Sequence, residues 1–201
     1  MDKKDRILLI DFSKVVSPIW ISKHLAERFS KYLKIPKEEI RIIYKRRIWP
    51  LTRWDYSISV SIDDFVPYLK DGCSTNDLFE ASKEIPPIDM NFLEWLKILR
   101  DKYIVYLASD IYEILGEAVK KELDKYFDGF ILSYEEKARK SEDIFWENLQ
   151  KKIDFSKIEL FVDDKEKNIS IAEKYGIPWL VYDASKWVES VIFAVNQDLK
   201  G

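Results

Sequence analysis

The sequence predicts an α/β fold in three layers, with helices covering both faces of a parallel sheet. Three observations predict it. Short, continuous apolar segments recur along the chain, as expected for strands that are buried on both faces. Amphipathic helical patterns lie between them, and this alternation is typical of parallel sheets. One long stretch after the first apolar segment breaks the alternation and predicts a mainly helical insertion.

Five segments are expected to be strands. Each is short, rich in Ile, Val, Leu, Phe or Tyr, and mostly continuous in its hydrophobicity, so each fits the interior of a sheet that is covered on both sides. In chain order they are Arg6–Ile10, Tyr103–Ala108, Gly129–Leu132, Glu159–Val162 and Trp179–Tyr182.

Helices are expected between these strands. Ser109–Phe127 carries its apolar residues on one stripe at helical spacing. Ser141 is the expected N-cap of the next helix. Lys165–Tyr175 predicts a third helix, which ends at Gly176 because glycine suits the position after a helix, and Pro178 prevents its continuation.

The stretch from about Val15 to Asp89 is the expected insertion. It contains no evident strand–helix unit, but it does contain helix signals. In chain order these are Pro18 behind Ser17 as a helix start, the basic amphipathic segment Ile40–Trp49, a capping box of Ser61 with Asp64, and Asp89 as the start of a helix that returns to the sheet.

Composition excludes several classes of protein. The chain of 201 residues fits one domain, or one domain with a sizeable insertion. Lys and Arg number 33 against 36 Asp and Glu, so there is no global attraction to nucleic acid or an anionic membrane. The single cysteine, Cys73, excludes an internal disulfide, and the single histidine, His24, excludes a multi-histidine metal site. Five glycines argue against a glycine-rich phosphate loop.

We expect neither an export signal nor a membrane-spanning segment. Ile7–Ile10 is flanked by Arg6 and Asp11 and is far shorter than the roughly 18 residues that a spanning helix needs. We therefore expect a cytoplasmic protein without a membrane or nucleic-acid partner. The oligomeric state is not set by the sequence.

Polar side chains follow the expected strands at their carboxyl ends, where open parallel sheets bind ligands. Asp11 follows the first strand, Ser109 the second, Lys140 comes after the third, and Asp163 with Asp164 follows the fourth. Three neighbouring carboxylates repel one another unless a cation is present, which points to an oxygen-preferring ion such as Mg²⁺. A carboxylate nucleophile, a divalent cation, a hydroxyl and a lysine are the parts that phosphoryl transfer needs.

Four stretches resemble the motifs of the haloacid dehalogenase (HAD) superfamily of hydrolases. ILLIDFSKV is similar to the first motif, with Asp11 in the nucleophile position, and IVYLASD to the second, with Ser109 and Asp110 at the phosphate. YFDGFILSYEEKARKSEDIF resembles the stretch before the motif lysine, which aligns better with Lys140 than with Lys137. FVDDKEKNISIAEKYGIP resembles the fourth motif. The motifs occur in order and cover nearly the whole chain outside the insertion.

The resemblance implies a Rossmann-like core formed by residues 1–15 and 89–201, with residues 16–88 as a helical cap. It also implies a Mg²⁺-dependent phosphatase that acts on a small phosphorylated metabolite. Ser109 would then donate a hydrogen bond to a phosphoryl oxygen, and Lys140 would neutralise charge between the nucleophile and the phosphate.

The implied metal and nucleophile sites share residues. Asp11 would attack phosphorus and carry the phosphoryl group until water hydrolyses it. Mg²⁺ would be held by the carboxylates of Asp11 and Asp164 and by the backbone carbonyl of Ser13, while Asp163 would assist directly or through water.

The sequence departs from the family pattern beside the nucleophile. Phosphatases of this family have a general acid/base aspartate where this chain has Ser13, and a hydroxyl cannot perform that proton transfer. Val15 replaces the usual threonine and Lys14 the usual glycine. Two alternatives therefore stay open: a catalytically impaired relative that binds metal and phosphate, and a 2-haloacid dehalogenase. The Asp163–Asp164 pair argues against the second, because dehalogenases use no metal.

Some residues allow two interpretations. His24 could supply the missing proton relay, or it could be a surface residue of its helix, which is the commoner case. Asn168 could be an exposed helix amide or could support the site. A basic and aromatic segment could bind an anion, RNA or a protein, although a solvated helix face with tryptophans in the core is the simpler interpretation: Lys45, Arg46, Arg47, Trp49, Arg53 and Trp54.

Overall fold

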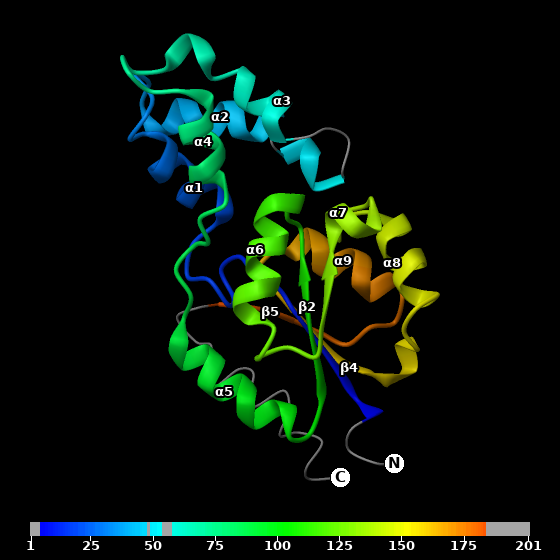
Figure 1. Ribbon diagram of the computed structural model, residues 1–201. Helices are drawn as coiled ribbons and strands as arrows, with labels where there is room; N and C mark the ends of the chain where they lie inside the picture. The colour runs from blue at the N-terminus through cyan, green and yellow to red at the C-terminus, as the bar shows by residue number, and fades with distance from the viewer. Residues whose placement is uncertain (1–4, 48, 54–57, 184–201) are drawn as a thin grey trace.

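The computed structural model describes residues 5–47, 49–53 and 58–183, and its centre is a five-stranded parallel sheet (Figure 1). The strand order is β3-β2-β1-β4-β5, so the first strand of the chain lies in the middle of the sheet. All four pairings are parallel. The strands are β1 (Ile7–Ile10), β2 (Ile104–Ser109), β3 (Gly129–Leu132), β4 (Ile158–Asp163) and β5 (Trp179–Val181).

Helices cover both faces of this sheet, because its central strand is apolar on both sides. Leu8 and Ile10 of β1 pack in a core with α5 (Met90–Arg100) and α6 (Glu113–Leu123). Leu9, between them, joins a second core with α8 (Asp143–Gln150) and α9 (Glu166–Lys174). Since successive side chains of a strand point to opposite faces, a continuous apolar run fills both cores. The short α7 (Ser133–Glu136) follows β3, and a 3₁₀ turn (Phe155–Lys157) precedes β4.

A group of helices lies beyond the carboxyl edge of the sheet (Figure 1). It is attached by the loop after β1 and by the segment before α5. Its elements are α1 (Ile21–Phe29), α2 (Lys37–Arg47), α3 (Ile58–Asp63), α4 (Thr75–Ser82) and the 3₁₀ turns η2 (Trp49–Arg53) and η3 (Val66–Tyr68). We call these elements the helical segment.

The predicted fold class is confirmed, and so are all five strands, with ends that shift by a single residue where they shift at all. Asp89 caps α5, because its carboxylate accepts hydrogen bonds from the backbone of Asn91 and Phe92. Gly176 follows α9 with a φ of +71°, the left-handed conformation that favours glycine. The division into a core of 1–15 with 89–201 and a cap of 16–88 stays a prediction.

Two predicted helix starts in the insertion are wrong. Helix α1 begins at Ile21 instead of Pro18, because Ser17 is held in a turn by a backbone bond to Phe12 O of 2.8 Å. Ser61 opens no helix; it lies within α3, and its hydroxyl donates to Arg47 O at 3.0 Å. The capping box of this region is instead formed by Ser74 and Asp77 at the start of α4.

Two predictions in the sheet-forming part also need correction. Ser141 is not an N-cap: α8 begins at Asp143 after Glu142, whose N–H donates to Arg139 O at 2.9 Å and closes a turn around Ser141. The helix expected over Ser109–Phe127 is shorter, Glu113–Leu123, because Ser109 still belongs to β2.

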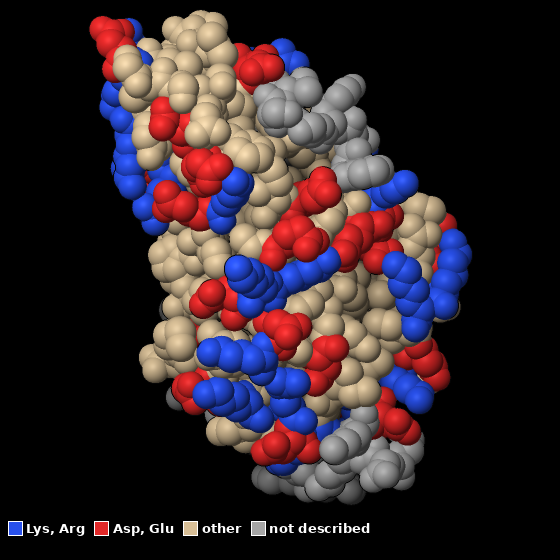
Figure 2. Space-filling view, in the orientation of Figure 1, with Lys and Arg blue, Asp and Glu red and all other residues tan. Residues whose placement is uncertain are grey.

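The distribution of charge on the surface agrees with the nearly equal numbers of basic and acidic residues in the sequence. Over the face in Figure 2, basic and acidic side chains are interspersed on the sheet-forming part. Within the described residues, no helix combines the length and the apolar character that crossing a bilayer requires.

Candidate active site

Three carboxylates meet at the carboxyl edge of the sheet. Asp11 follows β1, and its backbone N–H donates to Val162 O at 2.9 Å, which ties it to β4. Asp163 is the last residue of β4, and Asp164 comes directly after it. One carboxylate oxygen of each of the three lies within 4.8 Å of the others. Two adjacent parallel strands therefore bring together acids that are far apart in the sequence.

Lys140 lies between two of these acids and has no solvent-exposed surface. Its Nζ donates to Asp11 Oδ1, to Asp163 Oδ2 at 2.6 Å and to Ala108 O at 2.9 Å. Although burial acts to lower it, the carboxylates of Asp11 and Asp163 hold the pKa of Lys140 above its ordinary value. Lys137, the other candidate for the motif lysine, is exposed. The geometry thus places Lys140, and not Lys137, at the cluster.

The loop that carries Lys140 is fixed by its neighbours. Its backbone N–H donates to Asp110 Oδ1 at 3.0 Å, and its carbonyl accepts from Trp146 Nε1 at 2.8 Å. Both contacts are buried, so the ammonium group has one well-defined position. The carboxylate of Asp110 therefore holds the lysine loop, and a role of Asp110 in phosphate binding stays a prediction.

The three acids differ in how many of their carboxylate oxygens accept hydrogen bonds from the protein. Asp163 accepts from Lys165 N at 2.8 Å and from Asn168 Nδ2 at 2.9 Å, in addition to Lys140. Asp11 Oδ2 and Asp164 Oδ1, by contrast, are buried without a hydrogen-bond partner. Because buried polar atoms are almost always paired, these two oxygens are candidates for contact with a ligand or ion.

A buried hydroxyl completes this set. Ser109 ends β2, and its Oγ is also buried without a hydrogen-bond partner. It does not cap α6, whose N-cap is Tyr112. The carboxyl edge thus offers two open carboxylate oxygens and one open hydroxyl.

The electrostatics of the edge suit a bound cation. Burial raises the pKa of Asp11 to about 7; Lys140 opposes this rise, and Asp163 adds to it. A third acid, Asp164, lies beside them, so three carboxylates face the ammonium groups of Lys140 and, with a weaker effect, Lys165. The donor set consists of oxygens, two of them unpaired and buried, which fits a hard ion such as Mg²⁺.

The loop after Asp11 brings an unexpected residue to the site. Trp20, the N-cap of α1, donates its indole N–H to Asp164 Oδ2 at 3.0 Å. Lys14 lies over the same ring, 5.7 Å from its centroid, and has a φ of +67°. This left-handed conformation explains why the related motif has glycine at the position of Lys14. The Trp20 contact could not be predicted from the sequence, because Trp20 fits an ordinary apolar helix position.

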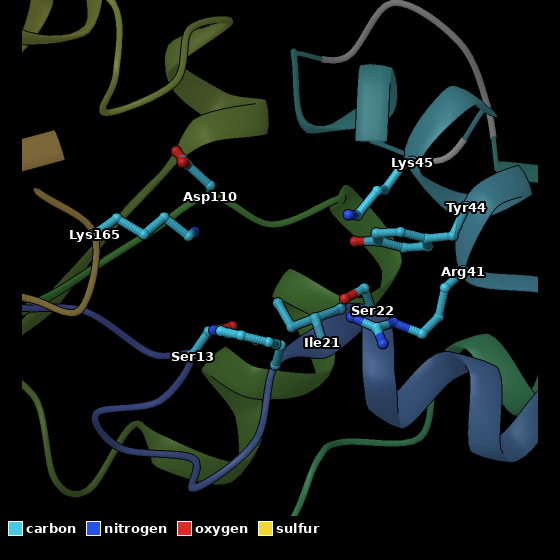
Figure 3. A pocket seen from close by; sticks show the side chains of 9 residues that line it. Ser13, Ile21, Ser22, Arg41, Tyr44, Lys45, Asp110 and Lys165 are labelled. Atoms are coloured by element: carbon cyan, nitrogen blue, oxygen red, sulfur yellow. The ribbon is translucent and has the colours of Figure 1, made fainter. Parts of the chain in front are cut away.

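A cavity of about 380 Å³ lies between the carboxyl edge and the helical segment (Figure 3). This volume is within the range of small-molecule sites. Its walls come from the sheet edge on one side and from α1 and α2 on the other. The lining residues are Ser13, Trp20, Ile21, Ser22, Arg41, Tyr44, Lys45, Asp110 and Lys165.

The fold matches solved structures, whereas no protein-family model and no curated protein matches the sequence. The HAD family enzyme BT-2542 from Bacteroides thetaiotaomicron aligns with a TM-score of 0.76 and 23% identity, over 93% of this chain and 98% of that one. A predicted HAD-like family hydrolase from Porphyromonas gingivalis aligns with a TM-score of 0.73 and 18% identity, over 94% and 97%. This chain has the HAD-like fold.

The HAD-like fold is shared by proteins with different chemistry. BT-2542 has been solved in complex with magnesium and inorganic phosphate. The defluorinating L-2-haloacid dehalogenase Rha0230 also aligns, with a TM-score of 0.65 and 13% identity, over 87% of this chain and 79% of that one. Fold similarity by itself therefore leaves the reaction open.

Within the HAD-like fold, most of the predicted site residues come together. Asp11, Lys140, Asp163 and Asp164 form the cluster, and Ser13 lines the adjacent cavity. The role of the Ser13 carbonyl as a metal ligand stays a prediction. Asn168 is buried and bonded to Asp163, so it supports the site and is not an exposed helix amide.

His24 does not join this group. It is buried, so the interpretation as a surface residue is wrong, and its Nε2 lies 3.0 Å from Glu84 O. It is not among the described residues that line the cavity. Of the basic and aromatic segment, Lys45 lines the cavity, and Trp54 lies outside the described residues.

Proposed function

We propose that this protein is a Mg²⁺-dependent HAD-like hydrolase of the phosphatase type, which acts on a small phosphorylated metabolite. The observation that carries the proposal is the buried, unpaired Oδ2 of Asp11, beside the Lys140 ammonium group and close to the carboxylates of Asp163 and Asp164. The magnesium and phosphate complex of BT-2542 supports it.

In the proposed metal site, the ligands are the carboxylates of Asp11 and Asp164 and the backbone carbonyl of Ser13, with Asp163 assisting. When bound, Mg²⁺ would neutralise the clustered carboxylates and the charge of the phosphoryl group. Trp20 would orient Asp164 by keeping one of its oxygens occupied, which leaves Oδ1 for the ion.

The proposed reaction has two steps on Asp11. Its Oδ2 attacks phosphorus, the bond from phosphorus to the ester oxygen breaks, and the electron pair leaves with that oxygen. Water then attacks the phosphorus of the aspartyl phosphate, which releases inorganic phosphate, restores the carboxylate and passes a proton to solvent. Lys140 and Ser109 stabilise the phosphoryl oxygens, and Lys140 also keeps Asp11 in position for attack.

Ser13 sets the rate of the first step. Because it is not an acid, it supplies no proton to the departing oxygen. Leaving groups that are stable as anions should therefore react much faster than alkoxides. The helical segment is the proposed cap: it covers the carboxyl edge and forms one wall of the cavity, so it would exclude water from the reaction and select the substrate.

A second candidate is a catalytically impaired relative that binds metal and phosphate. It is favoured by Ser13 at the position of the general acid and by Val15, which is buried and has no hydroxyl to offer. A 2-haloacid dehalogenase is a third candidate, favoured by the match to Rha0230 but disfavoured by the open oxygen of Asp164.

The test is turnover of 4-nitrophenyl phosphate with and without Mg²⁺. We expect metal-dependent release of phosphate that falls at least about 10³-fold in Asp11→Asn. Asp101→Asn is the matched control, because it makes the same change at the exposed C-cap of α5.

The candidates differ in their outcomes. If neither aryl nor alkyl phosphates react while Mg²⁺ still raises the melting temperature, the protein is the impaired relative. Release of halide from a 2-haloacid in the presence of a chelator identifies the dehalogenase. Both results contradict the proposed phosphatase.

A further inference from the structure

One face of α2 lines the cavity. Arg41, Tyr44 and Lys45 are spaced three and four residues apart, so they lie side by side on the helix. Figure 3 shows them on the side of the cavity opposite Ser13 and Lys165, which belong to the sheet edge. A molecule whose phosphate lies at the carboxyl edge would therefore extend its other end toward α2.

This wall carries positive charge without a matching carboxylate. Arg41 and Lys45 line the cavity from α2, and no acid of the described residues lines it from that helix. On the opposite wall, Asp110 is already bonded to the backbone of Lys140, and Lys165 interacts with the charge of Asp11. The positive charge of α2 is therefore not balanced by a carboxylate among the described lining residues.

Arg41 differs from other arginines of the described residues. Arg28 pairs with Glu84 at 2.8 Å, and Arg47, also on α2, pairs with Asp64 at 3.0 Å. Arg41 Nε is buried and has no hydrogen-bond partner. A guanidinium group kept without a protein anion at a cavity wall is well suited to bind a carboxylate or a phosphate of a ligand.

Apart from Ser13 and Ser22, the uncharged lining residues are apolar or aromatic. Tyr44 is buried, and Trp20 and Ile21 line the side formed by the start of α1. These surfaces favour a carbon framework, flat or aliphatic, between the two charged ends.

From this arrangement we infer that the substrate is a phosphate ester whose leaving group carries a second anionic group, a carboxylate or a phosphate, which binds to Arg41 with Lys45. The inference rests on the proposed function for the phosphate end. It adds the chemical class of the leaving group and names Arg41 as the residue that selects it.

The test measures binding to the Asp11→Asn variant in the presence of Mg²⁺, so that no turnover interferes. The probes are 4-carboxyphenyl phosphate and its neutral amide, 4-carbamoylphenyl phosphate, together with the corresponding pair that is one methylene longer. We expect the acid to bind at least about tenfold more tightly than the amide in one of the pairs. Phenylene 1,4-bisphosphate distinguishes a preference for a second phosphate from one for a carboxylate.

A second substitution assigns the preference to Arg41. In Asp11→Asn with Arg41→Gln, the ratio of acid to amide affinity should fall toward one. Asp11→Asn with Arg46→Gln is the matched control: it removes the same charge from the same helix at a residue that lines a different pocket, and the ratio should persist. Arg41→Gln should not lower the melting temperature, because the Nε of Arg41 has no partner to lose.

The outcomes separate this inference from the proposed function. Equal affinity for acid and amide in both pairs, including no measurable binding of either, overturns the inference. So does a preference that survives Arg41→Gln. If the preference depends on Arg41 but the native protein hydrolyses none of the esters, the phosphatase proposal fails and the assignment of the anion site stands.

Discussion

The carboxyl edge of the sheet and helix α2, which lie on either side of the cavity, differ in how their charged groups are paired. At the carboxyl edge, Lys140 is fully buried and bonded to both Asp11 and Asp163. On α2, Arg41 keeps a buried nitrogen without any partner. A buried ion pair fixes the positions of its groups, so the carboxyl edge is suited to a chemical step that is the same for every substrate. An unpaired cation is available to bind an anion, so α2 is suited to recognise the part of the substrate that varies. In the proposed function, reaction and specificity are therefore carried by different parts of the chain.

The largest expected effect comes from removing the Lys140 ammonium group at the carboxyl edge. Lys140→Met leaves Asp11 and Asp163 buried without their counter-charge, which should lower the free energy of unfolding by about 3–5 kcal/mol. Urea unfolding without metal measures it. Lys121→Met is the matched control, because that lysine is exposed on α6, and its change should stay within about 0.5 kcal/mol. Equal changes in the two variants would contradict the account of the edge.

The next effect concerns the missing acid. Ser13→Asp places a carboxyl group in the wall of the cavity beside Asp11 and should raise kcat for alkyl phosphates by about 10²-fold. The gain for 4-nitrophenyl phosphate should be much smaller, because that leaving group needs no proton. An equal gain in kcat for both substrates would show that Ser13 limits a step other than proton transfer.

A smaller effect is expected where the helical segment contacts the edge. Trp20→Phe removes the N–H that Asp164 accepts and should weaken Mg²⁺ binding about threefold to tenfold, measured by calorimetry. Trp179→Phe, at an exposed position of β5, is the control and should bind Mg²⁺ like the native protein. Unchanged affinity in Trp20→Phe would mean that Asp164 is oriented without it.

The smallest effect is a pH dependence inside the helical segment. Burial lowers the pKa of His24 in the folded protein, and nearby Arg28 acts in the same direction, while the hydrogen bond to Glu84 and the charges of Glu84 and Glu27 oppose it. The unfolded chain then binds more protons, so stability should fall as the pH drops through the ordinary histidine pKa of about 6.5. The raised pKa of Asp11 acts in the opposite direction, so the contribution of His24 is isolated as the difference in unfolding free energy between the native protein and His24→Gln. The native protein should lose stability relative to this variant as the pH drops, and a relative gain would reverse the sign.

The site residues that could be predicted from the sequence are those that lie at the end of a strand. Asp11, Ser109 and Asp163 each lie at the end of an apolar run, and parallel strands place such ends at one edge. The position of Lys140 is harder to predict from local pattern, because only the motif resemblance favours it over Lys137. In the structure, the bonds of its backbone to Asp110 and of its side chain to Asp11 separate the two.

The contributions of the helical segment could not be predicted. Whether Arg41 or Arg46 faces the cavity depends on how α2 packs over the sheet edge, and no local pattern fixes that rotation. Local hydrogen bonds also overrode helix signals: Ser17 and Ser61 are good capping residues in principle, but both bond elsewhere. Sequence patterns predicted the elements there and not their mutual orientation.

The central claim is that Asp11 carries the phosphoryl group. It is tested most directly by stopping turnover of an aryl phosphate in acid and mapping the phosphorylated peptide by mass spectrometry. The account predicts a phosphoryl group on the peptide that contains Asp11, lost in Asp11→Asn. Turnover with no acid-stable label on that peptide, or with the label on another residue, would contradict it.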